Sequence, residues 1–160
     1  KKQYDVIWLN NVLEHVLDPI SLLKDLKKLT SRGGVLVVTV PNDGSDLQEY
    51  CFNNNLIPNR FWIALPDHLS YFSYESLHSI AKNTGWDCND IIADFPIDFF
   101  LLHSGANYIA DKSCGSAAHR ARIQAELLLS NRNIDDVISY YQSMAKIGLG
   151  RDLTAFFKPT

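Results

Sequence analysis

The sequence lacks long hydrophobic runs, a clear excess of either charge, and closely spaced cysteines. No apolar stretch approaches the ~20 residues that cross a bilayer, so neither a transmembrane segment nor a membrane partner is expected. Fifteen Lys and Arg residues stand against eighteen Asp and Glu residues, which gives a net charge of -3. Because there is no basic surplus, nucleic acid is not an expected partner either.

Cysteine and histidine are too sparse and too scattered to form an evident metal or redox motif. Cys51, Cys88 and Cys114 include no C-x-x-C pair, which disfavours a zinc knuckle and a dithiol redox site. Free thiols in a reducing cytoplasm are the simplest interpretation. His78, His103 and His119 have no partners at metal-ligand spacing, so the sequence predicts no metal.

The chain opens on Lys1-Lys2-Gln3, without an initiating Met or a signal peptide. It then runs directly into a strand-like segment, which favours a cut through a longer protein. The length of 160 residues corresponds to a single domain, or to a large piece of one.

The first forty residues alternate between strand and helix patterns. Residues 4–9 are aromatic and β-branched, which predicts a mostly buried strand. Asp18-Pro19 favours the start of a helix, and we expect Gly33-Gly34 to close it. Residues 35–40 form a continuous apolar run, typical of a strand covered on both faces. This βαβ order predicts parallel strands, with ligands beyond their carboxyl ends at Asn10-Asn11 and Pro41-Asn42-Asp43.

The rest of the chain divides into three parts. Residues 44–70 appear irregular but aromatic, so 44–72 is a candidate lid. A helix from Ser73 to about Asn83, a strand over 86–95 and a last strand over 152–158 are predicted. Helices are also predicted over residues 116–130 and 134–147, so residues 99–148 are interpreted as a helical insertion. Such an insertion serves acceptor specificity, a dimer contact or simple coverage of the sheet.

Several of these motifs resemble class I S-adenosylmethionine-dependent methyltransferases. The segment around that superfamily's fourth strand is similar to residues 4–19, which read YDVIWLNNVLEHVLDP, and Leu13-Glu14-His15-Val16 is typical of the small-molecule branch. The Gly-Gly turn, strand and Pro-Asn over residues 29–42 resemble the next element. Residues 67–73, DHLSYFS, resemble the entry to the following helix. The resemblance covers residues 4–95 and resumes near 150–158.

The resemblance implies an α/β fold and methyl transfer from S-adenosylmethionine to a small-molecule acceptor such as a sugar or other metabolite. Residues 1–160 then form a single partial domain, the C-terminal half of a Rossmann-like methyltransferase sheet, strands four to seven, with a helical insertion. The family's glycine-rich cofactor turn and its acidic partner are absent from this sequence. The fragment alone is therefore expected to be inactive.

The resemblance and the strand ends together select the candidate site. Asn10 and Asn11 are candidate cofactor ligands, or polar strand ends that hydrogen-bond in a turn. His15 and His68 are the two candidate bases, although either can equally be a packing or capping residue. Glu14 is a candidate for ordering the site, for the cofactor or for catalysis; the alternative is a carboxylate that favours a helix N-terminus.

Three further residues are candidates for binding the acceptor. Asn42 follows the second strand, Tyr71 precedes a helix as a core or cleft-wall residue, and Trp62 belongs to an aromatic cluster. That cluster shapes an acceptor pocket or forms a small satellite core.

Two rival functions follow from the same features. A degenerate methyltransferase-like domain that serves interaction or assembly is the main alternative, because the cofactor turn is missing. A hydrolase is disfavoured because no G-x-S-x-G elbow occurs. An apolar strand over residues 4–9 with a bare edge further predicts a homodimer, or aggregation, through that edge.

Overall fold

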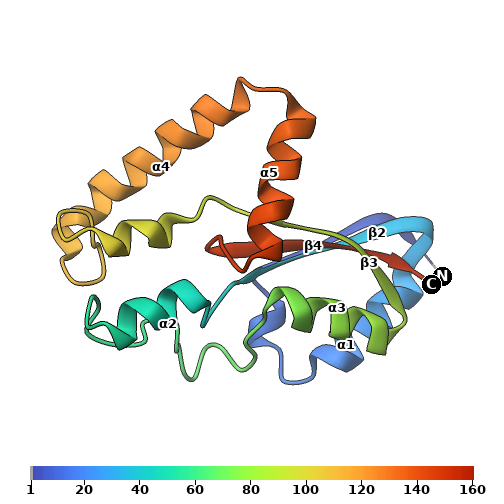
Figure 1. Cartoon of the computed structure of the whole chain (residues 1–160). Helices are drawn as coiled ribbons and strands as arrows, with labels where there is room; N and C mark the ends of the chain where they lie inside the picture. The colour runs from blue at the N-terminus through green and yellow to red at the C-terminus, as the bar shows by residue number, and fades with distance from the viewer. Residues whose placement is uncertain (1) are drawn as a thin grey trace.

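The computed structural model of the protein describes residues 2–160, and within them the chain forms a mixed sheet with helices on both faces (Figure 1). The strand order is β1-β2-β4-β3, over Tyr4–Asn10, Thr30–Pro41, Asp152–Pro159 and Trp86–Ala93. β1 and β2 are parallel, whereas β4 runs antiparallel to both of its neighbours, β2 and β3. The predicted α/β fold and the parallel βαβ unit are therefore confirmed.

The core lies between the sheet and helices α1 (Pro19–Leu29), α3 (Tyr74–Thr84) and α5 (Ile134–Lys146). α1 and α3 lie side by side under one face, and α5 packs on the other (Figure 1). Leu77 and Ala81 are buried and form the inner face of α3. The indole Nε1 of Trp86 donates to the carbonyl oxygen of Leu23 at 3.1 Å, so this large side chain is buried without a polar penalty.

The helix starts follow the predicted caps. Asp18 accepts a hydrogen bond from the backbone N–H of Ser21 at 2.9 Å, and Pro19 occupies the first turn. Ser73 caps α3 in a reciprocal capping box with Ser76, and Gly85 ends that helix with a φ of 83°.

The prediction that Gly33-Gly34 closes α1 is wrong. α1 ends at Leu29, and both glycines lie inside β2. They stand where the register between β1 and β2 shifts, since Tyr4 pairs with Thr30 but Val6 pairs with Val35. A Cβ at Gly34 would lie 3.0 Å from the carbonyl oxygen of Asp5, so glycine permits the close strand approach there.

A second, smaller core lies beside the sheet. It contains Cys51, Ile57, Trp62 and Leu101, which come from α2 (Asp46–Asn53), the following loop and the 3-10 helix η2 (Ile97–Leu102). The expectation that residues 44–70 are irregular throughout is wrong, because α2 begins in a capping box formed by Ser45 and Gln48. Trp62 thus packs in a satellite core, one of the two arrangements that the sequence allows for its aromatic cluster.

The segment before the last strand contains the two predicted helices, α4 (Gly115–Ser130) and α5. Short 3-10 turns lie at Leu13–His15 (η1) and Lys112–Cys114 (η3). The apolar stripe of α5 is only partly used. Met144 and Ala145 are buried, whereas Ile134 and Ile138 are exposed because the first half of the helix projects beyond the sheet. No helix in the described part of the chain is both long and apolar enough to cross a membrane.

The prediction that the first strand is mostly buried is wrong. The alternating side chains Tyr4, Val6 and Trp8 are 44%, 62% and 65% exposed. β1 lies at the end of the sheet order and pairs with β2 on one side. Its other edge therefore presents backbone groups beside apolar side chains, an arrangement that invites another strand.

We expect the 160-residue chain to associate through the edge of β1, and Val6→Lys to reduce that association, because a charged edge residue opposes strand addition. Light scattering across a concentration series measures the effect. Leu17→Lys is the matched control, since Leu17 is exposed but lies outside the strand. A wild-type chain that stays monomeric at high concentration would contradict the prediction.

Candidate functional site

The loops at the carboxyl ends of β1 and β2 meet the segment that leads into α3. The backbone carbonyl oxygen of Glu14 accepts two hydrogen bonds, from the N–H groups of Leu69 at 2.7 Å and Ser70 at 3.1 Å. These bonds hold the turn that carries Glu14 and His15 against the loop that carries His68. The structure therefore brings all three candidate catalytic side chains together at the edge of the sheet.

His15 is held by a backbone oxygen. Its Nδ1 lies 2.6 Å from the carbonyl oxygen of Asp67, and a carbonyl oxygen only accepts, so Nδ1 carries the proton. The other ring nitrogen, Nε2, keeps its lone pair and lies 3.6 Å from Oε1 of Glu14. The side chain of His15 is 44% exposed, which leaves Nε2 accessible to a ligand.

Glu14 is the most unusual residue of the group. Its side chain is only 2% exposed, and neither carboxylate oxygen has a hydrogen-bond partner within the described residues. A buried, unpartnered carboxylate is costly because its lost hydration is not replaced. The predicted alternative, a carboxylate that merely favours a helix N-terminus, does not account for this burial.

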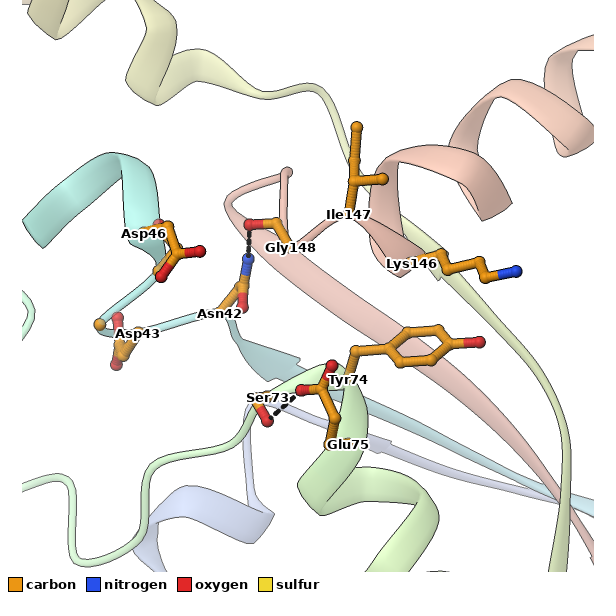
Figure 2. Close-up of a pocket in the computed structure, with 11 residues that line it drawn as sticks. Asn42, Asp43, Asp46, Ser73, Tyr74, Glu75, Lys146, Ile147 and Gly148 are labelled. Atoms are coloured by element: carbon orange, nitrogen blue, oxygen red, sulfur yellow. Dashed lines mark hydrogen bonds between the residues drawn. The ribbon is translucent and has the colours of Figure 1, made fainter. Parts of the chain in front are cut away.

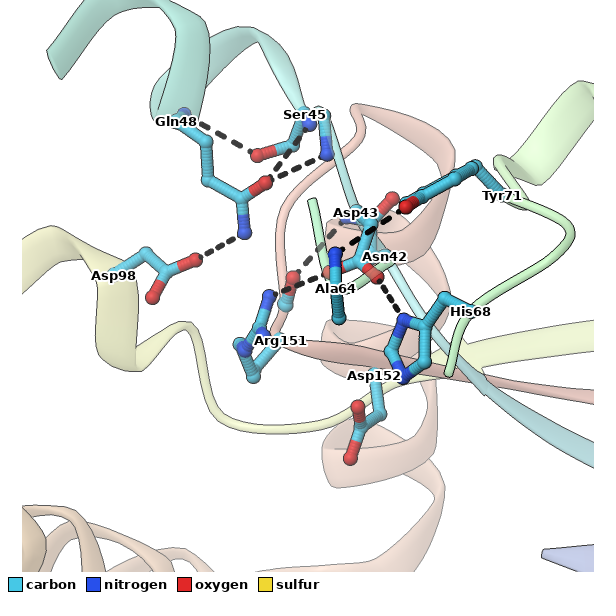
Figure 3. Close-up of polar contacts among 12 residues, drawn as sticks. Asn42, Asp43, Ser45, Gln48, Ala64, His68, Tyr71, Asp98, Arg151 and Asp152 are labelled. Carbon is cyan, nitrogen blue, oxygen red and sulfur yellow. Dashed lines mark hydrogen bonds and ion pairs between the residues drawn. The ribbon is translucent and has the colours of Figure 1, made fainter. Parts of the chain in front are cut away.

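His68 is positioned by a buried carboxylate that the sequence analysis did not select. Oδ2 of Asp43 lies 3.1 Å from Nδ1 of His68, and Oδ1 of Asp43 accepts from Nη1 of Arg151 at 3.0 Å (Figure 3). Because the carboxylate accepts a hydrogen bond from Nδ1–H, the neutral form of the His68 ring has its lone pair at Nε2. The rings of His15 and His68 have centroids 5.0 Å apart.

Arg151 connects this group to a second polar network. Burial opposes its charge, but the carboxylates of Asp98 and Asp43 raise the pKa of Arg151. Asp98 accepts a hydrogen bond from Nε2 of Gln48 at 2.7 Å (Figure 3). It also accepts one from the hydroxyl of Tyr108. Asp43 is recognisable from its place at a strand end, whereas nothing near Arg151 in the sequence marks it as a partner.

Asn42 is committed to the backbone. Its side-chain amide donates to the carbonyl oxygens of Gly148 and Gly150, both at 3.1 Å, and Figure 2 shows the first of these bonds. The residue is buried, although it borders a polar cavity of about 280 Å³ between the N-termini of α2 and α3. The amide therefore serves to join the end of β2 to the turn before β4.

Trp62 and Tyr71 border a second cavity, of about 330 Å³, which Asp43 also lines. The ring of Tyr71 lies 6.2 Å from that of His68, so the cavity adjoins the histidine pair. The hydroxyl of Tyr71 accepts from the backbone N–H of Ala64 at 3.3 Å. Both residues are thus placed as acceptor contacts would be, even though Trp62 is also part of the satellite core.

Asn10 and Asn11 are exposed at the end of β1. Asn11 adopts a left-handed conformation with a φ of 51°, and its backbone N–H donates to the carbonyl oxygen of Thr39 at 3.0 Å. Within the described residues, neither side-chain amide forms a hydrogen bond to the protein, so both are available to a ligand.

The sequence of the first part of the chain decides its family. A family model described as "Methyltransferase domain" matches residues 1–90, which is more than half of the chain. The chain belongs to the methyltransferase domain family. This family assignment confirms the resemblance on which the sequence analysis relied. No sequence among functionally curated proteins matches the chain.

A solved structure is similar in fold to this methyltransferase domain. A chain from the complex of the Trm112 methyltransferase activator with a methyltransferase of Haloferax volcanii is similar, with a TM-score of 0.51 and 12% identity over 99% of this chain and 55% of that one. A protein described as a sarcosine dimethylglycine methyltransferase, from Galdieria sulphuraria, gives a TM-score of 0.45 and 18% identity over 98% of this chain and 53% of that one.

A phosphoethanolamine N-methyltransferase of Haemonchus contortus, solved with S-adenosyl-L-methionine, gives a TM-score of 0.43 and 18% identity over 98% of this chain and 34% of that one. The methyltransferase domain thus spans about half the length of the first two of these structures and about a third of the length of the other. The predicted partial Rossmann-like methyltransferase fold is confirmed by the likeness to the Haloferax volcanii complex.

One more carboxylate at this end of the sheet is strongly perturbed. Oδ1 of Asp94, just after β3, accepts from the backbone N–H groups of Arg151 at 2.6 Å and Asp152 at 2.8 Å. Burial nevertheless raises the pKa of Asp94 from its ordinary 3.8 to about 6. The folded state therefore binds this proton more tightly than the unfolded state does, so its contribution to stability is lost as the pH rises from about 4 to about 6.

Asn42→Ala should lower the free energy of unfolding by about 1–3 kcal/mol, because the partly buried carbonyl oxygen of Gly148 and the buried one of Gly150 lose their donor. Urea denaturation measures the loss. Asn54→Ala removes a comparable amide-to-carbonyl hydrogen bond at an exposed position and should cost less than about 0.5 kcal/mol. Equal losses in the two variants would contradict the joining role of Asn42.

Asp94→Asn should be more stable than the wild type above pH 7, by about 1–3 kcal/mol, because it keeps the Oδ1 acceptor without the buried charge. The advantage should vanish near pH 4, where the wild-type carboxyl is protonated in the folded state. Unfolding curves across this pH range provide the measurement. Asp111→Asn should not show the effect, since hydrogen bonding from Ser113 lowers the pKa of that exposed carboxyl. A pH-independent difference for Asp94→Asn would refute the assignment.

Proposed function

We propose that the protein transfers a methyl group from S-adenosylmethionine to a small-molecule acceptor, and that the acceptor is activated at Glu14, His15 and His68. The observation that carries this proposal is the meeting of these three side chains beside the Trp62–Tyr71 cavity. Membership of the methyltransferase domain family supports the reaction class. Ligands of open α/β sheets bind at this carboxyl edge, which supports the location.

The residues at the end of β1 fit one wall of a cofactor site. Asn10 and Asn11 present unpaired side-chain amides there, within the described part of the chain. Amide groups can bind both the amino and the carboxylate ends of an amino-acid moiety such as that of S-adenosylmethionine. When bound, the cofactor supplies a methyl group on a sulfonium, which leaves as a neutral thioether. The domain therefore has little need to activate the donor.

The acceptor needs more from the protein, since its reacting atom must lose a proton and face the methyl group in line. Nε2 of His15 and Nε2 of His68 both keep lone pairs, because each Nδ1 donates to a fixed oxygen. Such lone pairs, beside a buried carboxylate, form the part of the site that can draw a proton from an acceptor. Asp43 is then a positioning residue, since it acts through the ring of His68.

The size and walls of the adjoining cavity support a small acceptor. Its volume of about 330 Å³ lies in the range of small-ligand pockets, and Trp62 and Leu65 give it apolar walls. The three free cysteines further support a reducing, cytoplasmic setting for the reaction.

His68→Ala should lower kcat for methyl transfer by about 10²–10⁴-fold while leaving the Kd for S-adenosylmethionine unchanged. The protein expressed from its complete reading frame is incubated with methyl-labelled S-adenosylmethionine and pooled small metabolites, and labelled products are quantified. Calorimetry gives the Kd. His119→Ala, on the exposed face of α4, is the matched control and should retain full activity.

Two results would count against this function. If the protein from the complete reading frame fails to bind S-adenosylmethionine, the alternative of an interaction or assembly domain becomes the better conclusion. If His68→Ala transfers methyl groups at the wild-type rate, the acceptor is activated elsewhere.

A further inference from the structure

The cluster of Glu14, His15 and His68 has the spacing of a metal-ligand set. One candidate ligand atom of each residue lies within 4.8 Å of the other two. Two atoms that each lie about 2.1 Å from one ion are roughly 3.0–3.4 Å apart. Nε2 of His15 and Oε1 of Glu14, at 3.6 Å, are already close to that separation. Side-chain shifts of roughly 1 Å bring the remaining ligand atoms to that separation.

The burial of Glu14 is an independent observation that points to a cation as its ligand. Its carboxylate is buried and unpartnered within the described residues, whereas the other buried carboxylates at this edge are satisfied. Asp43 pairs with Arg151 and His68, and Asp98 accepts from Gln48 and Tyr108. A bound cation would supply to Glu14 the counter-charge that the protein does not.

Both histidines are also oriented as metal ligands are. Metal-binding imidazoles commonly donate their second ring nitrogen to a carboxylate or a backbone carbonyl, which fixes the tautomer and aims the free nitrogen at the ion. Nδ1 of His15 donates to the carbonyl oxygen of Asp67, and Nδ1 of His68 donates to Asp43. The protein therefore provides the outer partners that such a site requires, one of each kind.

We propose that Glu14, His15 and His68 bind one divalent first-row transition-metal ion. Two imidazoles and one carboxylate favour ions such as Zn²⁺, Mn²⁺ or Co²⁺ over Mg²⁺ and Ca²⁺, which prefer oxygen ligands. Three protein ligands leave open coordination positions, the arrangement of a catalytic rather than a structural site. Because the side chain of His15 is 44% exposed, these positions face a region that a ligand can reach.

The bound ion determines which acceptor can react. This role of the ion rests on the proposed function, whereas the binding of the ion does not. Because both Nε2 lone pairs are then bound to the ion, the ion replaces the histidines as the group that activates the acceptor: a hydroxyl bound to it becomes more acidic and loses its proton to water. The oxygen keeps the electron pair and forms the new bond to the methyl carbon. The bond from that carbon to sulfur breaks, and the sulfur retains its electron pair as a neutral thioether. The inferred acceptor is therefore a small molecule with a hydroxyl group, and the product is its methyl ether.

Titration with Co²⁺ tests the site directly, because coordinated Co²⁺ absorbs visible light. Untagged protein from the complete reading frame is treated with a chelator, freed of it and titrated. We expect one Co²⁺ per chain, displaced by Zn²⁺. Glu14→Gln and His68→Ala should abolish binding, and Asp43→Asn should weaken it about 10–100-fold, because it replaces the charged outer partner of His68 with a neutral amide. His119→Ala should bind like the wild type.

Thermal unfolding separates loss of the site from loss of the fold. Glu14→Gln removes a buried charge, so its metal-free Tm should be at or above that of the wild type. The metal should raise the Tm of the wild type and leave that of Glu14→Gln unchanged. Absence of Co²⁺ binding by the wild type, or binding that survives both Glu14→Gln and His68→Ala, would overturn the metal site.

Methyl-transfer assays distinguish the two proposals. Loss of activity on chelation, restored by Mn²⁺ or Zn²⁺, supports the metal as part of the reaction. Full activity in metal-free protein overturns the role of the ion in acceptor activation and leaves the proposed function intact. Metal binding with methyl transfer to other small molecules but to no hydroxyl acceptor overturns the inferred acceptor class, and metal binding with no methyl transfer to any small molecule leaves the site standing and overturns the proposed function.

Discussion

The candidate site depends on one buried carboxylate, that of Asp43. It stands at the end of β2 and bonds to Arg151 before β4 and to His68 before α3. The adjacent residue, Asn42, ties the same strand end to the carbonyl oxygens of Gly148 and Gly150. Two neighbouring residues thus align three segments that are far apart in the sequence. The orientation of the His68 ring, and with it the geometry of the whole cluster, follows from this alignment.

Local chemistry made much of the fold predictable. Asp18, Ser73 and Gly85 mark helix ends because capping depends on residues only a few positions away. Asn10 and Asn42 were predicted near a ligand because parallel strands present their carboxyl ends together. The pairing of Asp43 with Arg151 was not predictable, since 108 positions separate them and the contact depends on where β4 inserts. The burial of Glu14 was also hidden, because a Glu in a short turn is ordinarily solvated. Gly33 and Gly34 were misassigned because a helix end and a shift in strand register both favour glycine.

Polar costs are concentrated at one end of the sheet. The unpartnered Glu14 and the perturbed Asp94 both lie near the carboxyl ends of the parallel strands. At the opposite end, Trp86 packs under β4 and satisfies its indole on the carbonyl oxygen of Leu23. Burial of apolar side chains stabilises the fold at one end of the sheet, whereas the buried carboxylates destabilise it at the other. Such a division is often found where a protein holds ionisable groups in place for a ligand.

The position of β4 affects the order in which the sheet folds. This strand forms the last part of the sequence, yet it lies between β2 and β3 and contributes the buried residues Leu153, Ala155 and Phe157. β2 and β3 have no direct hydrogen-bonded pairing within the sheet, so they cannot join until β4 arrives. The facing edges of β2 and β3 therefore stay unpaired until β4 inserts between them, and this single late insertion completes the sheet.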